Sequence, residues 1–230
     1  SGSAYIFRWN GTTWEKVVKL TASDGSSYDY FGISVSISSD AAIVGSHGDD
    51  DSGAYSGSAY IFRWNGTTWE EEDKLIASDG SDSYLFGSSV SISGDTTIVG
   101  SNGDDEIAPD SGSAYIFRWN GTTWQEKDKL TASDGSNYDN FGQSVSISGD
   151  TAIVGSYYDD DMGNDSGSSY IFHRNGTTWV EVVKLIPTDG SDNDYFGVSV
   201  SISGNAAIMG SFRDDDLGTD VGSAYIVRLE

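Results

Sequence analysis

Alternation of small polar and large apolar residues marks the first strand of a recurring set. In Phe31–Ser38, serine alternates with isoleucine and valine, a period of two that is typical of a β-strand with one small and one large face. Residues 41–46 form a short apolar run, as expected of a strand buried on both faces. Residues 56–63 and 69–75 are also strand-like, and the half-polar second run predicts an outer strand. We name these predicted strands A, B, C and D in chain order; no segment shows useful helical periodicity.

Turn sequences connect these predicted strands. Ser38-Ser39-Asp40 links A to B tightly, and Asn-Gly links C to D. Asn-Gly is a strong hairpin signal, because a type I′ turn needs positive φ at both central residues. The B–C and D–A connections are longer, acidic and rich in glycine and serine. Four strands joined in this way predict an antiparallel meander, with the B–C and D–A loops on one face and the two hairpin turns on the other.

The whole set recurs with a period of 55 residues. The stretch that begins at Ser1 returns at Ser56 and Ser111, at Ser166 with small changes, and at Val221 in truncated form. Such a period indicates one supersecondary unit used repeatedly. Four antiparallel strands per unit are typical of propeller blades; a β-solenoid is the main alternative, although its repeats are usually shorter. We therefore predict an all-β fold, a β-propeller of four 55-residue, four-stranded antiparallel blades in a single repeat domain over 1–230.

The two ends of the chain carry unequal sets of strands. Residues 1–30 supply a C and a D strand, complete blades follow in 31–85, 86–140 and 141–195, and 196–230 supply only A, B and C. We expect the N-terminal D strand to complete the fourth blade, which leaves a surplus terminal C strand. One interpretation is a frayed copy, or a cut from a longer array. The other is that the surplus strand pairs with a neighbouring molecule, since a head-to-tail contact that does not close builds a filament.

A Phe-Gly pair opens every A strand, and a glycine closes every B strand about thirteen residues later. The pairs begin at Phe31, Phe86, Phe141 and Phe196, and the closing glycines are Gly45, Gly100, Gly155 and Gly210. This pattern resembles the FG-GAP repeat of integrin α-subunit propellers, and is closer to secreted bacterial and algal relatives. The resemblance implies an extracellular propeller. Two features depart from it: Gly-Ser replaces Gly-Ala, and the family's propellers commonly have seven blades.

Composition excludes several classes of partner. The chain has 36 acidic and 12 basic residues, a formal charge of −24, which repels nucleic acid and anionic membranes. No apolar run approaches membrane-spanning length, so we expect no membrane insertion. The chain has no cysteine, so neither disulfides nor thiolate metal sites stabilise it.

The acidic B–C loops predict a cation site. Carboxylates at alternate positions, followed by glycine, suit a hard cation such as Ca²⁺. The candidate ligands are Asp49, Asp51, Asp104, Glu106, Asp110, Asp159, Asp161, Asp165, Asp214, Asp216 and Asp220. The loops resemble integrin calcium loops in composition but lie between B and C rather than A and B; a solvated acidic loop is the alternative. The D–A loops add four aspartates, each followed by glycine, which fit turns equally well: Asp24, Asp79, Asp134 and Asp189.

The opposite face carries sequences that accept N-linked glycans. Every C–D hairpin contains Asn-Gly-Thr, and the third B–C loop adds one further acceptor pattern. The candidate sites are Asn10, Asn65, Asn120, Asn175 and Asn164. Tryptophans flank the hairpins; cross-strand packing explains them best, and a sugar-stacking platform is the alternative.

No arrangement of residues indicates catalysis. The two histidines, His47 and His173, occupy non-equivalent repeat positions, and the many serines lack a nucleophile elbow. We therefore expect a non-enzymatic extracellular structural protein, a subunit of a glycosylated filament formed by head-to-tail strand exchange. The alternative is an integrin-like, calcium-dependent adhesion or ligand-binding propeller with a carbohydrate or cell-surface partner. The loops vary little between repeats, which favours the scaffold.

Overall fold

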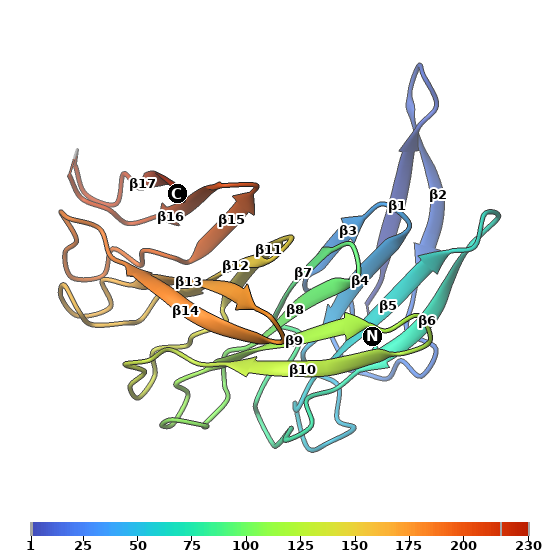
Figure 1. The fold of residues 1–230 in the computed structure, drawn as a ribbon, viewed down its shortest axis with the longest axis horizontal. Helices are drawn as coiled ribbons and strands as arrows, with labels where there is room; N and C mark the ends of the chain where they lie inside the picture. Colours follow the sequence, from blue (N-terminus) through green and yellow to red (C-terminus); the bar gives the residue numbers. More distant parts are fainter. Residues whose placement is uncertain (1, 217, 230) are drawn as a thin grey trace.

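The computed structural model describes residues 2–216 and 218–229, so Ser1, where the repeated stretch begins, lies outside the described residues. These residues form seventeen strands and no helix (Figure 1). Three complete four-stranded antiparallel sheets follow the predicted meander. Their strands are β3 (Val35–Ser38), β4 (Ala41–Ser46), β5 (Ser58–Trp64) and β6 (Trp69–Leu75); β7 (Ser89–Ser93), β8 (Thr96–Ser101), β9 (Ser113–Trp119) and β10 (Trp124–Leu130); β11 (Ser144–Ser148), β12 (Thr151–Ser156), β13 (Ser168–Asn175) and β14 (Thr178–Leu185). The prediction of an all-β fold with four antiparallel strands in each repeat is confirmed.

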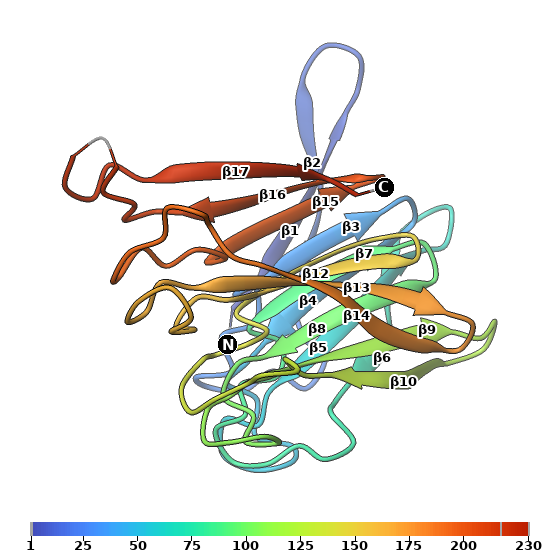
Figure 2. The same cartoon turned by 60° about the vertical axis from the view of Figure 1, so that its left-hand side comes forward.

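Smaller sheets lie at both ends of the chain. The first pairs β1 (Ala4–Trp9) with β2 (Trp14–Leu20), and the last contains β15 (Ser199–Ser203), β16 (Ala206–Ser211) and β17 (Ser223–Arg228). The five sheets follow one another along an open arc, with the β1–β2 hairpin at one end and β15–β17 at the other (Figures 1 and 2). The N-terminal D strand, β2, pairs with β1 and not with β17. The expected completion of the last blade by this strand is therefore not realised in this single chain.

The C–D hairpins form as predicted, but their turns are not type I′. In the first, Gly11 has φ +99° whereas Asn10 does not lie in the left-handed region. The side-chain oxygen of Asn10 instead accepts hydrogen bonds from the N–H groups of Thr12 and Thr13, each at 2.9 Å. In the first three hairpins the asparagine side chain thus caps the loop, and the asparagine N–H donates to the carbonyl oxygen of the second threonine. The fourth hairpin keeps a two-residue turn, Gly176-Thr177, between β13 and β14.

Consecutive repeats pack through their A strands at close range. A Cβ atom at Gly45 would lie 2.0 Å from the carbonyl oxygen of Gly87, so only glycine fits. Ser34 Oγ donates to the same oxygen at 2.8 Å, and the N–H of Ile92 donates to Ser36 Oγ at 3.2 Å. These contacts recur between the later sheets as Ser89–Gly142 (2.7 Å), Ile147–Ser91 (3.1 Å), Ser144–Gly197 (2.7 Å) and Ile202–Ser146 (3.1 Å). We call this set of contacts between neighbouring repeats the repeat interface.

The large face of each A strand packs against its neighbour, except at the first sheet. Val90 and Ile92 of β7 are 8% and 5% exposed, whereas their equivalents Val35 and Ile37 of β3 are 60% and 56% exposed. The first A strand has no preceding A strand beside it among the described residues. The first sheet of the arc therefore exposes an apolar surface, whereas the equivalent surface of each inner repeat is buried.

Candidate functional site: the aspartate–lysine clusters

The B–C and D–A loops meet on one rim of the arc, as predicted, and bring carboxylates together. In the first complete sheet, Asp24 comes from the D–A loop, and Asp49 and Asp51 come from the B–C loop. A lysine of β6 reaches all three: Lys74 Nζ lies 2.6 Å from Asp24, 2.6 Å from Asp51 and 3.2 Å from Asp49. We call such a group an aspartate–lysine cluster.

The second and third sheets contain the same cluster. Lys129 Nζ lies 2.6 Å from Asp79, 3.0 Å from Asp104 and 3.2 Å from Glu106. Lys184 Nζ lies 2.7 Å from Asp134, 2.7 Å from Asp161 and 2.9 Å from Asp159. The B–C aspartate nearest the sheet is buried each time, and the side chain of Asp104 is 0% exposed.

A buried tyrosine lies beneath each lysine and fixes the cluster to the sheet. The hydroxyl oxygen of Tyr60, on β5, lies 2.7 Å from Asp24 Oδ1 and 3.0 Å from Asp49 Oδ2. Lys74 Nζ lies 5.2 Å from the centroid of the Tyr60 ring, within range of a cation–π interaction. Tyr60 and Lys74 are register partners on β5 and β6, so the strand pairing itself places the ammonium over the ring.

The electrostatics hold each cluster in its ionised form. Burial alone would lower the pKa of Lys74, but the hydrogen bonds with Asp24, Asp51 and Tyr60 raise it above its usual value. Burial also opposes ionisation of Asp24, yet hydrogen bonds from Lys74 and Tyr60 hold the pKa of that carboxyl below its usual range. Both shifts favour the ion pair between the Lys74 ammonium and the Asp24 carboxylate.

This arrangement bears directly on the calcium prediction. Oxygen atoms of Asp24, Asp49 and Asp51 lie within 4.8 Å of one another, as do those of the third cluster, so carboxylates do gather where calcium was expected. The lysine ammonium, however, lies among them and already supplies the cation. Calcium could bind there only if the lysine moved away, and calcium binding stays a prediction.

Three predicted ligands lie outside the clusters: Asp110, Asp165 and Asp220. Each has φ between +51° and +54°, and its N–H donates to the side chain of the aspartate five residues earlier, at 2.7–2.8 Å. Tyr55 occupies the equivalent position in the first loop, with the same φ region and the same hydrogen bond from its N–H to Asp50. The position therefore shapes the turn and does not require a carboxylate.

The fourth cluster differs from the other three because it lacks a lysine among the described residues. The hydroxyl of Tyr225, on β17, lies 2.6 Å from Asp214 and 3.0 Å from Asp189, and Asp216 follows on the same loop as Asp214. Asp194 lies nearby with only 3% exposure, and its Oδ1 has no hydrogen-bond partner. Burial, together with the charges of Asp214, Asp215 and Asp189, raises the pKa of Asp194.

Sequence reasoning missed the lysines, although their spacing was visible. Lys19, Lys74, Lys129 and Lys184 recur at the repeat period, and the last three follow the D–A aspartate of their own cluster by 50 residues. A basic residue at a fixed place in every D strand was the signal that could have revealed the clusters.

The candidate glycan acceptors are all solvent-exposed, as glycosylation requires: Asn10, Asn65, Asn120, Asn164 and Asn175. Four of them lie at the C–D hairpins and Asn164 lies in a B–C loop. At Asn65 the side-chain oxygen accepts hydrogen bonds from the N–H groups of Thr67 and Thr68 at 2.9 and 3.0 Å. Occupancy by glycans stays a prediction.

The tryptophans mostly pack between repeats. Trp124 is 6% exposed, and its Nε1 donates to Glu72 of the preceding repeat at 3.1 Å. The first pair is different: the rings of Trp9 and Trp14 contact each other at a tilt, with 5.9 Å between their centroids, but are 50% and 66% exposed. Packing therefore accounts for the inner tryptophans and leaves the first pair open to solvent.

The comparisons with known proteins support this architecture. A family model of the FG-GAP repeat matches four times, over residues 14–62, 69–117, 124–172 and 179–227. Each match begins at a D strand and ends in a C strand, so the D strand of one matched unit completes the sheet of the unit before it. A search of curated proteins gave no match, and no helix among the described residues is long and apolar enough to span a membrane. FG-GAP repeats are typical of extracellular adhesion and ligand-binding propellers, and with four matches that cover most of its length, this chain belongs to the FG-GAP repeat family.

Proposed function

We propose that this protein is a non-enzymatic extracellular scaffold that assembles with copies of itself. One observation carries the proposal: the two ends of the arc expose what the inner repeats bury or pair. Val35 and Ile37 at the first sheet are 60% and 56% exposed, and β17 at the last sheet has no outer neighbour among residues 2–216 and 218–229. An unpaired strand edge and an exposed apolar face are surfaces that drive association of protein chains.

The remaining surface is compatible with a secreted, glycosylated subunit. The acceptor asparagines lie on the hairpins and one loop, away from the A strands through which repeats contact each other. The charge of −24 keeps the arc soluble and opposes association at low ionic strength, when repulsion is unscreened. We expect assembly to strengthen with salt up to physiological levels.

The test is sedimentation velocity and electron microscopy of the 230-residue chain over a range of concentrations. The buffers contain about 0.02 M or about 0.15 M salt, with millimolar calcium or with chelator. Head-to-tail oligomers or filaments that grow with concentration and with salt support the proposal. A monomer at every concentration and salt level refutes it.

An adhesion or ligand-binding role is the second candidate, favoured by the exposed Trp9–Trp14 pair. A shallow groove beside this pair is lined by Phe7, Arg8 and Trp64, among others. Exposed aromatic rings next to polar groups are a surface on which sugar rings stack. Binding to a glycan array that is lost in Trp14→Ala but kept in Val180→Ala, an exposed control on β14, would favour this role.

A further inference from the structure

We propose that the fourth cluster takes its lysine from a second copy of this chain. In that contact β2 of the second copy leaves its own β1, pairs with the outer edge of β17, and places Lys19 among Asp189, Asp214 and Asp216. This inference rests on the proposed self-assembly and specifies its interface. It is derived from the contacts that the inner repeats of the same chain already make.

The register of the inner sheets determines where a fourth strand would place its lysine. In each complete sheet a tyrosine of strand C pairs with the cluster lysine of strand D: Tyr60 with Lys74, Tyr115 with Lys129, and Tyr170 with Lys184. The β1–β2 hairpin has the same pair, Tyr5 and Lys19. β17 carries Tyr225 at the equivalent position, so β2 in this register beside β17 sets Lys19 opposite Tyr225.

When β2 exchanges its partner β1 for β17, the number of backbone hydrogen bonds that it makes stays nearly the same. The two strands read Ala-Tyr-Ile-Phe-Arg from Ala4 and Ala-Tyr-Ile-Val-Arg from Ala224, and differ in one side chain. β2 therefore loses one ladder and gains a nearly identical one. The ion cluster then decides the direction of exchange.

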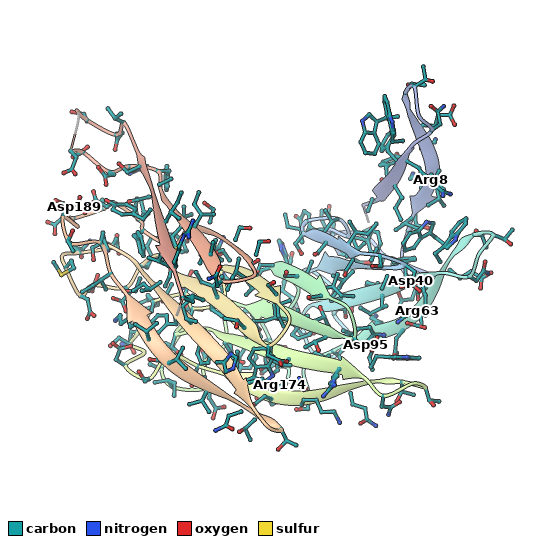
Figure 3. All side chains as sticks on the ribbon, turned by 45° about the horizontal axis from the view of Figure 1, so that its top comes forward. Arg8, Asp40, Arg63, Asp95, Arg174 and Asp189 are labelled. Carbon is teal, nitrogen blue, oxygen red and sulfur yellow. The ribbon has the colours of Figure 1, made fainter. Side chains whose placement is uncertain are left out.

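The charges on the two sides are complementary. Lys19 is exposed and makes no ion pair among the described residues. Across the junction, Asp214 is 3% exposed and has no ammonium beside it within the described part of the chain. Figure 3 shows Asp189 and Arg8 of β1 at opposite ends of the arc, so the hairpin that carries Lys19 lies far from the fourth cluster of its own chain.

The same docking covers the exposed A strands. The serines of β15, Ser199, Ser201 and Ser203, are exposed, whereas their inner equivalents form the serine contacts of the repeat interface. β3 of the second copy would lie against these serines, and this contact would bury its Val35 and Ile37. Within one chain, β7 lies against the serines of β3 in the same way, and its Val90 and Ile92 are buried.

A third contact joins two exposed apolar surfaces. In the inner repeats Trp124 meets Glu72 and Asp73 of the preceding D strand. At the junction Trp14 of the second copy would meet Val182 and Val183, which are 57% and 39% exposed. An exposed indole thus faces exposed valines where the inner repeats use carboxylates.

One contact of the repeat interface is lost in this docking. Glu71 accepts hydrogen bonds from Ser23 at 2.9 and 2.7 Å, and this pairing recurs in the later repeats. The equivalent residues at the junction are Lys16 and Thr188, which cannot reproduce it. The junction is therefore similar to the repeat interface but not identical to it.

Disulfide trapping reports which partner β2 takes, because the chain has no cysteine of its own. Glu15 pairs with Arg8 in the β1–β2 hairpin, and the inner register would pair it with Arg228 of another copy. A mixture of Glu15→Cys and Arg228→Cys chains should form a covalent dimer on mild oxidation. The double variant Arg8→Cys/Glu15→Cys is the control and should form an intrachain disulfide instead.

Two substitutions test the contact without cysteine chemistry. Lys19→Glu should weaken association about tenfold or more, because it sets a carboxylate against three others. Gly210→Ala should also weaken association, because the equivalent Gly45 faces the Gly87 carbonyl of the neighbouring repeat, where a Cβ atom does not fit. Within the monomer the nearest atom to a Cβ added at Gly210 is Ser199 Oγ at 2.5 Å, which can rotate away, so the variant should still fold. Lys127→Glu, an exposed charge reversal on β10, is the matched control and should change association less than about twofold. Thermal unfolding of each monomer, unchanged from the wild type, shows that the variants fold.

A mixing experiment separates this contact from general charge repulsion. Asp216→Lys supplies an ammonium to the fourth cluster and should also weaken association of identical copies. Lys19→Glu mixed with Asp216→Lys should associate in equal proportions, because the intact Lys19 of one variant meets the intact fourth cluster of the other, whereas general charge repulsion predicts no gain on mixing.

The outcomes distinguish this inference from the proposed function. If the wild-type chain stays monomeric, self-assembly is refuted. If the wild type assembles, but Lys19→Glu and Gly210→Ala assemble equally well and no 15–228 disulfide forms, assembly stands and this interface is wrong. The 15–228 disulfide, with weakened association of both variants and rescue on mixing, supports the interface.

Discussion

Removal of one cluster lysine tests whether the clusters stabilise the fold. We consider Lys129→Met, which keeps the length of the side chain but removes the ammonium that lies 3.0 Å from the fully buried Asp104. At that distance two unit charges attract by about 5 kcal/mol in a medium with an effective dielectric constant of about 20. Part of this attraction offsets the desolvation of both groups, so it is not the net effect.

The remaining carboxylate sets the loss of stability. Removing one partner of a buried ion pair leaves an uncompensated buried charge, which typically costs about 3–5 kcal/mol. Asp79 and Glu106 are half exposed, at 42% and 53%, so solvent screens their share. We therefore expect a loss of about 2–4 kcal/mol, or about 5–15 °C in Tm for a chain of this size.

The assay is calorimetric and urea unfolding of the purified chain at pH 7 and at pH 4. The control is Lys127→Met, an exposed lysine on the same strand whose removal should change the free energy of unfolding by less than about 0.5 kcal/mol. The difference between the two variants should shrink at pH 4, because added protons relieve the repulsion among carboxylates that the ammonium no longer offsets. Equal stability of Lys129→Met and Lys127→Met at pH 7 would show that the cluster contributes nothing.

Three further substitutions probe the same architecture. Lys74→Met leaves Asp24, Asp49 and Asp51 without a resident cation. Millimolar calcium should then raise the Tm of this variant by a few degrees, which corresponds to about 1–2 kcal/mol at a Kd near 10⁻⁴–10⁻³ M. Calcium should raise the Tm of the control Lys127→Met less. Burial raises the pKa of Asp139 to about 6. The folded state therefore binds this proton more tightly than the unfolded state, and the fold loses stability as the pH rises through that value. In urea unfolding, Asp139→Asn should raise the free energy of unfolding by about 1–3 kcal/mol at pH 7 and change it little at pH 4. Gly155→Ala would set a Cβ 1.9 Å from the Gly197 carbonyl oxygen and should destabilise by about 3 kcal/mol or more, whereas Gly149→Ala, with open space and φ +59°, should lose only about 1 kcal/mol.

Local pattern and the repeat period were sufficient to predict the strands and their order. Alternation in Phe31–Ser38 and the apolar run at 41–46 predicted the antiparallel pair β3–β4, because period-two patterning and short turns leave few other solutions. The loops at Asp24 and Asp49 were expected on one face, and they meet there. The turn type was wrong, because the Asn10 side chain closes a longer loop that dipeptide statistics do not describe.

The content of the clusters was not predicted, because it depends on contacts between strands that are distant in sequence. Lys74 lies 50 residues from Asp24, and only the pairing of β6 with β5 brings them together. Alternating carboxylates were interpreted as a metal loop, since the sequence of one loop cannot show which cation lies among them. Closure of the ring was expected from a count of strands, but the spatial separation of β2 and β17 depends on the angle between successive sheets, which no single repeat encodes.

Comparison of the copies within the chain indicates which positions a neighbour constrains. Gly45, Gly100 and Gly155 each face a backbone carbonyl of the next repeat, and Gly210 is still glycine although no such carbonyl lies beside it in the described structure. The fourth cluster likewise keeps its three aspartates and its tyrosine without a lysine. Other positions do change between the copies, as Trp9 and Arg174 show at equivalent hairpin positions. Retention of this glycine and of these carboxylates fits the proposed contact, in which a second copy supplies the strand beside β17.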